Sequence, residues 1–148
     1  MVEIHTGSCL CGGVTFETRG DLREVVYCHC GQCRRQTGLY YASTNAADRD
    51  LTIRGDENLT WYQSSDKGRR GFCRICGSAL FWKYEGLDHI SIQAGSFDLP
   101  SRLVAGYHIF CEDKGDFYEI NDGLPQFRKG RPGLADQYGL RATLRPKG

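Results

Sequence analysis

The feature that most constrains this sequence is the spacing of its cysteines. Seven of the eight cysteines fall into three tight groups. The groups are Cys9-Leu10-Cys11, Cys28-His29-Cys30-Gly31-Gln32-Cys33 and Cys73-Arg74-Ile75-Cys76. Thiols this close in sequence converge readily on one soft metal ion, so the three groups predict metal sites that tie distant parts of the chain together.

Length and composition favour one globular domain. The chain has 148 residues, 40% of them hydrophobic, and we predict a single domain over residues 1–148. Because it contains no run of about 18 apolar residues and no apolar segment between Met1 and Thr6, we expect neither a membrane span nor a signal peptide. Eight cysteines in such a chain indicate reduced thiols in the cytoplasm, where these spacings mean metal or redox chemistry rather than disulfides.

Net charge gives no reason to expect a nucleic-acid or membrane partner, since it is only +1. Positive charge does gather in residues 128–148, which hold six Lys or Arg against Asp136 alone. A short terminus of this kind is typically a solvated end. The sequence leaves the oligomeric state open.

Short alternating segments predict a mainly β fold with little helix. The predicted strands are residues 12–19, 24–28, 39–44, 51–53, 59–63, 69–73, 79–84, 89–93 and 104–110. Residues 31–37 are polar and predict one helical turn, which Gly38 ends. Leu134, Tyr138 and Leu140 form a weak helical stripe or no regular element. Strands of this number and length suit an antiparallel β domain of two sheets.

The pair Cys73 and Cys76 has the spacing of a zinc knuckle. Two intervening residues let a tight turn place both sulfurs about 2.3 Å from one zinc ion, and Gly77 tolerates the left-handed backbone that such a turn needs. Cys9 and Cys11, which two glycines follow, offer the same chemistry on a tighter turn. Together the two pairs predict a closed four-sulfur zinc site whose binding energy is folding energy.

The run Cys28, Cys30 and Cys33 is one ligand short of a tetrahedron. Three protein ligands with an open fourth position are typical of catalytic zinc, where a water or a substrate atom binds and its pKa falls. Sulfur ligands favour a soft incoming donor. A small-molecule thiol is therefore the substrate that this site predicts.

Spacing leaves two alternatives open. In the first, Cys111 or a histidine such as His108 supplies a fourth ligand, and the three-cysteine run becomes a second closed site. In the second, the partners exchange, and Cys28 and Cys30 close on the cysteines of residues 73–76. Spacing does not choose between these arrangements.

Three stretches of the chain form a specific set of motifs, in the same order and at similar intervals as in a known family. They are Gly7-Ser8-Cys9-Leu10-Cys11-Gly12-Gly13-Val14, Cys28-His29-Cys30-Gly31-Gln32-Cys33-Arg34 and Phe72-Cys73-Arg74-Ile75-Cys76-Gly77-Ser78. In these motifs the chain resembles the glutathione-dependent formaldehyde-activating enzyme family over nearly its whole length. The resemblance implies a zinc-binding β-tent fold and a carbon–sulfur lyase, similar to S-(hydroxymethyl)glutathione synthase, that joins glutathione or a similar thiol to formaldehyde or another small aldehyde.

The same resemblance implies up to two zinc ions per chain. Its structural zinc would be held by Cys9, Cys11, Cys73 and Cys76. Its exchangeable catalytic zinc would be held by Cys28, Cys30 and Cys33. Spacing alone does not determine this assignment of the cysteines to two zinc ions.

Residues beside the three-cysteine run are further candidates. Arg34 and Arg35 could hold a substrate carboxylate bidentately or offset the negative charge of the thiolates, although an exposed arginine pair after a turn is often only solvated. His29 lies between two ligands and is expected to point away from the metal, which disfavours a proton-transfer role.

Cys111 belongs to none of the three groups. It is predicted to be a small buried hydrophobic residue at the strand of residues 104–110. The alternative is a reactive thiol, as in the methionine sulfoxide reductases, which share the β-tent fold. A third class is a zinc-stabilised thiol carrier or binding module without catalysis.

Overall fold

The structure is a computed structural model that describes residues 2–132, and these group into two compact units. Within the described residues, unit 1 comprises residues 2–23 and 43–103, and unit 2 comprises residues 24–42 and 104–132. The single domain over residues 1–148 stays a prediction. The stripe of Leu134, Tyr138 and Leu140 and most of the basic terminus lie outside the described residues.

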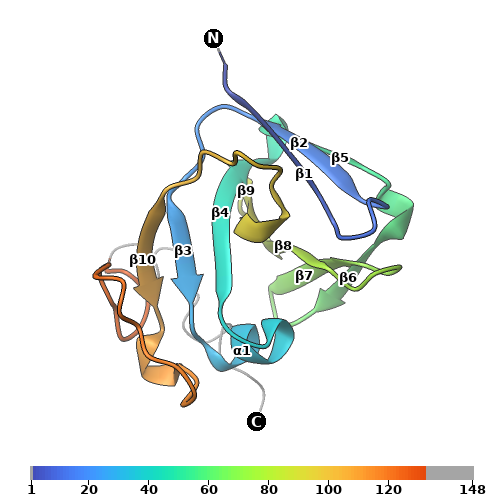
Figure 1. Ribbon diagram of the computed structural model, residues 1–148. Helices are drawn as coiled ribbons and strands as arrows, with labels where there is room; N and C mark the ends of the chain where they lie inside the picture. The colour runs from blue at the N-terminus through green and yellow to red at the C-terminus, as the bar shows by residue number, and fades with distance from the viewer. Residues whose placement is uncertain (1, 133–148) are drawn as a thin grey trace. The chain divides into compact units, whose positions relative to one another are not determined.

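Unit 1 contains a three-stranded antiparallel sheet in the order β1-β2-β5 (Figure 1). These strands are β1 (Ile4–Ser8), β2 (Thr15–Arg19) and β5 (Leu51–Arg54). β2 alternates as its sequence predicts, since Phe16 and Thr18 are buried while their neighbours are not. β1 was not predicted from sequence, because its residues IHTGS include few apolar side chains, and the strand forms through its backbone pairing with β2.

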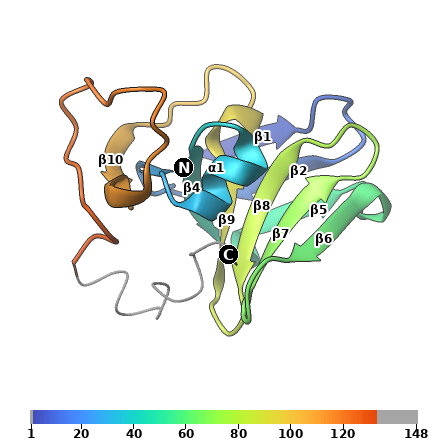
Figure 2. The same ribbon diagram turned by 90° about the horizontal axis from the view of Figure 1, so that it is seen from below.

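Unit 1 also contains a run of antiparallel strands in the order β4-β9-β8-β7-β6, and Figure 2 shows β8, β7 and β6 side by side. The strands are β4 (Tyr41–Ala47), β6 (Leu59–Gln63), β7 (Gly68–Cys73), β8 (Ala79–Tyr84) and β9 (His89–Gln93), and β4 enters this unit at Ser43. Short 3-10 turns are η1 (Asp48–Asp50), η2 (Asp56–Asn58) and η3 (Ala94–Ser96). The predictions for β8 and β9 have the observed bounds, whereas β4 begins and ends later than predicted.

Both sets of strands in unit 1 bury side chains in one hydrophobic core. Phe16 of β2 packs edge-on against Phe81 of β8 and Phe97, with ring centroids 5.7 and 5.2 Å apart. Cys9 and Cys73 belong to the same buried cluster. Two of the predicted metal ligands therefore lie at the margin of the core, where packing holds their positions.

Unit 2 contains β3 (Val25–Cys28), which pairs in parallel with β10 (Ala105–Ile109). Between β3 and β4 the chain forms α1 (Gly31–Thr37), and after β10 it forms the short turn η4 (Cys111–Asp113). α1 ends as predicted, at Gly38, whose φ of 84° lies in the left-handed region that glycine tolerates. The prediction of a mainly β zinc-type fold with little helix is confirmed, with one parallel pair among the antiparallel ones.

Among residues 2–132, none of the helices has the length and apolar character required to cross a bilayer.

Gly55 offers a test of how tightly the turn beyond β5 packs against the loop that follows Cys11. Its φ is 77°, and a Cβ at this position would lie 2.0 Å from the carbonyl oxygen of Gly13. We expect Gly55→Ala to lower the free energy of unfolding by about 2–4 kcal/mol. The strain of a left-handed backbone at alanine and the steric overlap of its Cβ with Gly13 both contribute.

Gly86→Ala is the matched control, since Gly86 also has positive φ, at 87°, but its Cβ would meet no atom within 4 Å. It should cost only about 1 kcal/mol. Urea denaturation of both variants measures the difference, and equal losses would show that the contact with Gly13 is unimportant.

Candidate metal centres

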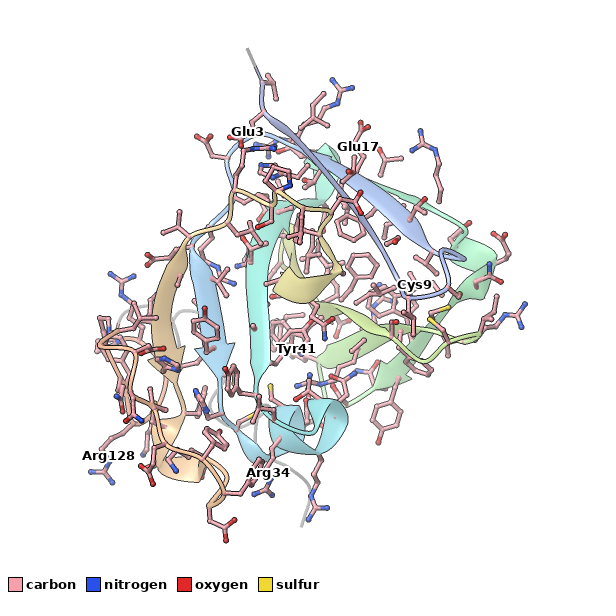
Figure 3. The ribbon with its side chains drawn as sticks, viewed as in Figure 1. Glu3, Cys9, Glu17, Arg34, Tyr41 and Arg128 are labelled. Carbon is pink, nitrogen blue, oxygen red and sulfur yellow. The ribbon has the colours of Figure 1, made fainter. Side chains whose placement is uncertain are left out.

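Four cysteines of unit 1 converge at the ends of β1 and β7 and in the turns that follow. They are Cys9, Cys11, Cys73 and Cys76, and their sulfur atoms all lie within 4.8 Å of one another. Figure 3 shows Cys9 at the turn after β1. The grouping is the one that the family resemblance implies, and that these cysteines hold zinc stays a prediction.

Sulfur spacing in the four-sulfur cluster fits a tetrahedral zinc ion. The Cys9 and Cys11 sulfurs are 3.6 Å apart, and the Cys11 and Cys73 sulfurs are 3.7 Å apart. Four ligands at the usual zinc–sulfur distance form a tetrahedron with an edge of about 3.8 Å. A disulfide would need about 2.05 Å between the sulfurs, so these distances favour metal ligation over cross-linking.

Backbone amides around the four-sulfur cluster donate to its sulfurs. Val14 N–H donates to Cys9 Sγ at 3.3 Å, Gly13 N–H to Cys11 Sγ at 3.4 Å and Ile75 N–H to Cys73 Sγ at 3.4 Å. Such bonds offset the negative charge that remains when four thiolates surround a divalent ion. The turns thus supply ligands together with the groups that stabilise them as thiolates.

The thiol pKa values show why this cluster suits a cation. Hydrogen bonds from Ser78, first its hydroxyl and then its N–H, lower the pKa of Cys76 to about 5. For Cys11, the Gly13 N–H lowers the pKa, but burial and the neighbouring thiols outweigh it and raise the pKa to about 11. Cys76 therefore forms a thiolate easily while Cys11 resists ionisation, and a bound divalent cation would favour the ionised form of all four thiols.

The three-cysteine cluster lies in unit 2, where β3 runs into α1. Cys28 ends β3, Cys30 caps the N-terminus of α1 by accepting from the Cys33 N–H at 3.3 Å, and Cys33 lies in the first turn of the helix. The three sulfurs lie within 4.8 Å of one another, and all three residues are buried. A strand end followed at once by a helix start thus turns three nearby residues toward one point.

Mutual repulsion also dominates the ionisation of the three-cysteine cluster. The neighbouring thiols Cys30 and Cys33, together with burial, raise the pKa of Cys28 well above its usual range. For Cys30, the hydrogen bond with Cys28 lowers the pKa, but Cys33 and burial outweigh it and raise the pKa to about 12. Three buried thiols that cannot ionise together without a cation fit a zinc ion, as in the four-sulfur cluster.

Neither proposed fourth ligand joins the three-cysteine cluster. Both ring nitrogens of His108 lie within hydrogen-bond distance of side chains, Nδ1 at 2.7 Å from His29 Nε2 and Nε2 at 2.8 Å from Asp122 Oδ2. In the described part of the chain, Cys111 belongs to no group of potential ligands within this distance limit. The open fourth position is therefore the arrangement that the geometry favours.

Cys111 does not lie in the strand predicted for it. It begins η4, just beyond β10, and is half-buried, with its N–H donating to Phe127 O at 3.0 Å. Burial raises the pKa of the Cys111 thiol. A raised pKa reduces the thiolate fraction and so disfavours the reactive-thiol alternative.

His29 is the main residue whose surroundings the sequence did not predict. It is fully buried, and its Nδ1 lies 2.5 Å from the Tyr118 hydroxyl while its Nε2 lies 2.7 Å from His108 Nδ1. Burial and the charge of His108 lower the pKa of His29 to about 4. The only sequence signals were a histidine between two ligands and another in a mostly apolar strand, and neither identifies a partner.

The two candidate arginines differ in exposure. Figure 3 places Arg34 on α1, directly after Cys33 in the sequence. Arg34 is half-buried, whereas Arg35 is exposed. Arg34 also lies close enough to Tyr118 for its charge to favour the ionised phenol, although burial has the larger effect and raises the pKa of Tyr118. Arg34 is thus the better placed of the two to act at the three-cysteine cluster.

Comparisons with known proteins agree with this fold and these motifs. Residues 4–113 match the model of a family described as glutathione-dependent formaldehyde-activating enzyme. An uncharacterized lyase of Schizosaccharomyces pombe is 24% identical over 124 residues, which cover 83% of this chain and 90% of that protein. A crystal structure of a Rhodobacter sphaeroides protein has a TM-score of 0.54 and 24% identity, over 82% of this chain and 98% of that one.

The family match covers most of the chain, including all seven grouped cysteines. The chain belongs to the glutathione-dependent formaldehyde-activating enzyme family. Likeness to the Rhodobacter sphaeroides structure supports the fold.

Loss of the two clusters should have different effects. Cys73→Ser should lower the free energy of unfolding by at least about 3 kcal/mol or leave insoluble protein, because the four-sulfur cluster joins distant turns and its metal-binding energy is folding energy. Cys30→Ser should cost no more than about 1–2 kcal/mol, since serine also caps helices and the three ligands are close in sequence.

Thermal denaturation and elemental analysis of protein purified without chelator measure both effects. We expect up to two zinc ions per chain in the unmodified protein and one fewer in the Cys30→Ser variant. Zinc well below one per chain would reject both metal sites. If Cys30→Ser unfolds the protein as severely as Cys73→Ser, the three-cysteine cluster is structural as well.

Proposed function

We propose that this protein is a zinc-dependent carbon–sulfur lyase that joins a small thiol to formaldehyde or another small aldehyde at the three-cysteine cluster. Glutathione is the first thiol to consider, and the activity would then be that of an S-(hydroxymethyl)glutathione synthase. Membership of the glutathione-dependent formaldehyde-activating family supports this proposal, as does the relative named as a lyase.

The observation that carries the proposal is the difference between the two clusters. Four cysteines can close a tetrahedron and leave no position for a substrate, whereas Cys28, Cys30 and Cys33 leave one position open. Zinc held by these three thiolates would offer that position to a soft donor and lower the pKa of an incoming thiol, so that the thiol reacts as thiolate near neutral pH.

The proposed reaction is an addition that balances without an oxidant. The thiol loses its proton, its sulfur forms a bond to the carbonyl carbon, and the π electron pair moves to the oxygen. That oxygen then takes up a proton, so the product is a hydroxymethyl thioether. Holding thiol and aldehyde side by side would make the attack effectively intramolecular.

Arg34 is the proposed binding group for the thiol substrate. Glutathione carries two carboxylates, and a guanidinium holds a carboxylate through two parallel hydrogen bonds. Arg34 follows Cys33 on α1 and is only half-exposed, so a bound carboxylate would be partly shielded from water. Arg35 is exposed and would contribute less.

Exchange spectroscopy of glutathione with formaldehyde, with and without protein, tests the reaction. We expect the zinc-loaded protein to accelerate the exchange and Cys30→Ser to abolish the acceleration while the protein stays folded. Because formaldehyde adds to thiols unaided, the uncatalysed rate is the necessary baseline. If none of several thiols is accelerated but glutathione still binds, the protein is a thiol carrier instead, and turnover of methionine sulfoxide would indicate a reductase.

Substitution of the arginines separately tests the substrate-binding role. Arg34→Gln should raise KM for glutathione about 10-fold with little change in kcat, because it removes a charge-assisted bond to the substrate. Arg35→Gln is the matched control and should change KM less than about 2-fold. A thiol without a carboxylate, such as 2-mercaptoethanol, should show no Arg34 effect. An equal effect on both thiols would contradict carboxylate recognition by Arg34.

A further inference from the structure

A chain of four hydrogen-bonded side chains in unit 2 leads from an exposed carboxylate to the three-cysteine cluster. We call the side chains Asp122, His108, His29 and Tyr118 the histidine chain. Successive contacts are 2.8 Å from Asp122 Oδ2 to His108 Nε2, 2.7 Å from His108 Nδ1 to His29 Nε2 and 2.5 Å from His29 Nδ1 to the Tyr118 hydroxyl. The two imidazoles are buried, at 3% and 0% exposure, so each nitrogen depends on its protein partner.

The carboxylate of Asp122 determines in which direction each hydrogen bond of the histidine chain is donated. An ionised carboxylate only accepts hydrogen bonds, so His108 carries its proton on Nε2 and donates it to Asp122. His108 Nδ1 is then an acceptor, and the proton between the two imidazoles belongs to His29 Nε2. Asp122 is itself held, because its other oxygen accepts the Leu124 N–H at 3.0 Å.

The histidine chain reaches the metal-binding loop at its centre. His29 lies between Cys28 and Cys30 in sequence, and its ring is held at both nitrogens. Its backbone N–H donates to Ile109 O of β10 at 3.0 Å, which fixes the same residue a second time. A residue held in this way restricts the backbone on either side, and therefore restricts the positions of both neighbouring sulfurs.

Aromatic rings pack around the two imidazoles and limit their rotation. Tyr27 stacks on His108 with ring centroids 4.8 Å apart, and Tyr40 packs against His29 at the same distance. Tyr118 stacks on His29 at 5.6 Å, and Lys114 Nζ lies over the Tyr118 ring and donates to Tyr118 O at 2.6 Å. The histidine chain is thus a packed network whose imidazole nitrogens have hydrogen-bond partners, rather than a set of loose surface contacts.

We propose that Asp122 is a positioning residue for the three-cysteine cluster, because it acts through His108 and His29 to hold the metal-binding loop in its ligating geometry. The inference rests on the proposed function only in its kinetic consequence. In metal sites, the groups that orient the ligands typically account for 10- to 100-fold in metal affinity. The segment that follows β10 would then determine how firmly unit 2 retains its metal.

Asp122→Asn tests this role with little risk to folding, because the Asp122 side chain is 45% exposed. If Asn Oδ1 still accepts from the Leu124 N–H, the amide NH₂ faces the His108 N–H, and two donors then oppose each other. The bond must break or His108 must change tautomer. Asp116→Asn is the matched control, since Asp116 is an exposed aspartate of the same segment.

Metal affinity is the first readout. In the zinc-loaded full-length protein, competition with a chromophoric chelator should show one zinc ion held roughly 10- to 100-fold more weakly in Asp122→Asn, and no change in Asp116→Asn. The more tightly held zinc should be unaffected by either substitution. Equal affinities in the two variants overturn the proposal.

Tyr118→Phe against Tyr40→Phe probes the other end of the histidine chain. Both substitutions keep an aromatic ring beside His29, but only Tyr118→Phe removes a hydroxyl bonded to His29. Tyr118→Phe should lower the affinity for the same zinc ion, and Tyr40→Phe should not. An effect of Tyr118→Phe without one of Asp122→Asn would assign the positioning to Tyr118 alone and overturn the role of Asp122.

Histidine tautomers provide a readout that does not depend on activity. Long-range proton–nitrogen correlation spectra of the zinc-loaded protein should show His29 and His108 protonated on Nε2 and not on Nδ1. In Asp122→Asn the His108 Nε2–H signal should shift or disappear. Protonation of His108 on Nδ1 in the unmodified protein would contradict the direction derived from the carboxylate.

Addition of excess zinc is the kinetic test, and it separates the positioning role of Asp122 from the proposed function. If Asp122 acts through metal retention, excess zinc should restore thiol–aldehyde exchange in Asp122→Asn but not in Cys30→Ser. Activity of Asp122→Asn that stays low with zinc bound would contradict a role through metal retention. If the unmodified protein has no activity but its metal affinities and tautomers are as expected, the proposed function fails and the positioning role stands.

Discussion

The convergence of four sulfur atoms is the constraint on which unit 1 depends. Cys9 and Cys11 come from the turn after β1, Cys73 ends β7 and Cys76 lies in the turn that follows, so the cluster joins strands that are far apart in the sequence. Because Cys9 and Cys73 are buried in the hydrophobic core, packing holds two of the four sulfurs, and metal ligation would reinforce that packing. Sulfurs 3.6–3.7 Å apart repel one another as thiolates, and a divalent cation would replace that repulsion with attraction to a common ion.

The three-cysteine cluster is positioned differently from the four-sulfur cluster. Its ligands are close in sequence and need only the passage from β3 into α1 to face one another. Long-range support comes instead from His29, which lies between two of the cysteines and bonds to His108 of β10 and to Tyr118 beyond it. A cluster whose cysteines are local and whose support is distant could hold a metal ion with an open position without losing its shape.

Much of the fold follows from local patterns, and the exceptions have identifiable causes. The apolar and aromatic sequence of β8, the alternating sequence of β9 and the glycine after α1 are local signals that predict these two strands and the end of the helix. β1 has no such pattern, because its role is to pair with β2 through backbone groups that every residue carries. The parallel pairing of β3 with β10 also has no local signal, since it joins segments that are far apart in the sequence.

Cysteine spacing by itself determined which thiols form short-range groups, because spacing of two or three residues acts within a single turn. It left open whether the three-cysteine run has a fourth ligand. Only the tertiary structure decided that the pairs at Cys9 and Cys73 meet, and that His29 is joined to His108, Tyr118 and, through His108, to Asp122. His29 is separated from Tyr118 by 89 positions and from His108 by 79. Contacts at that separation arise from strand pairing and burial, which local sequence patterns do not encode.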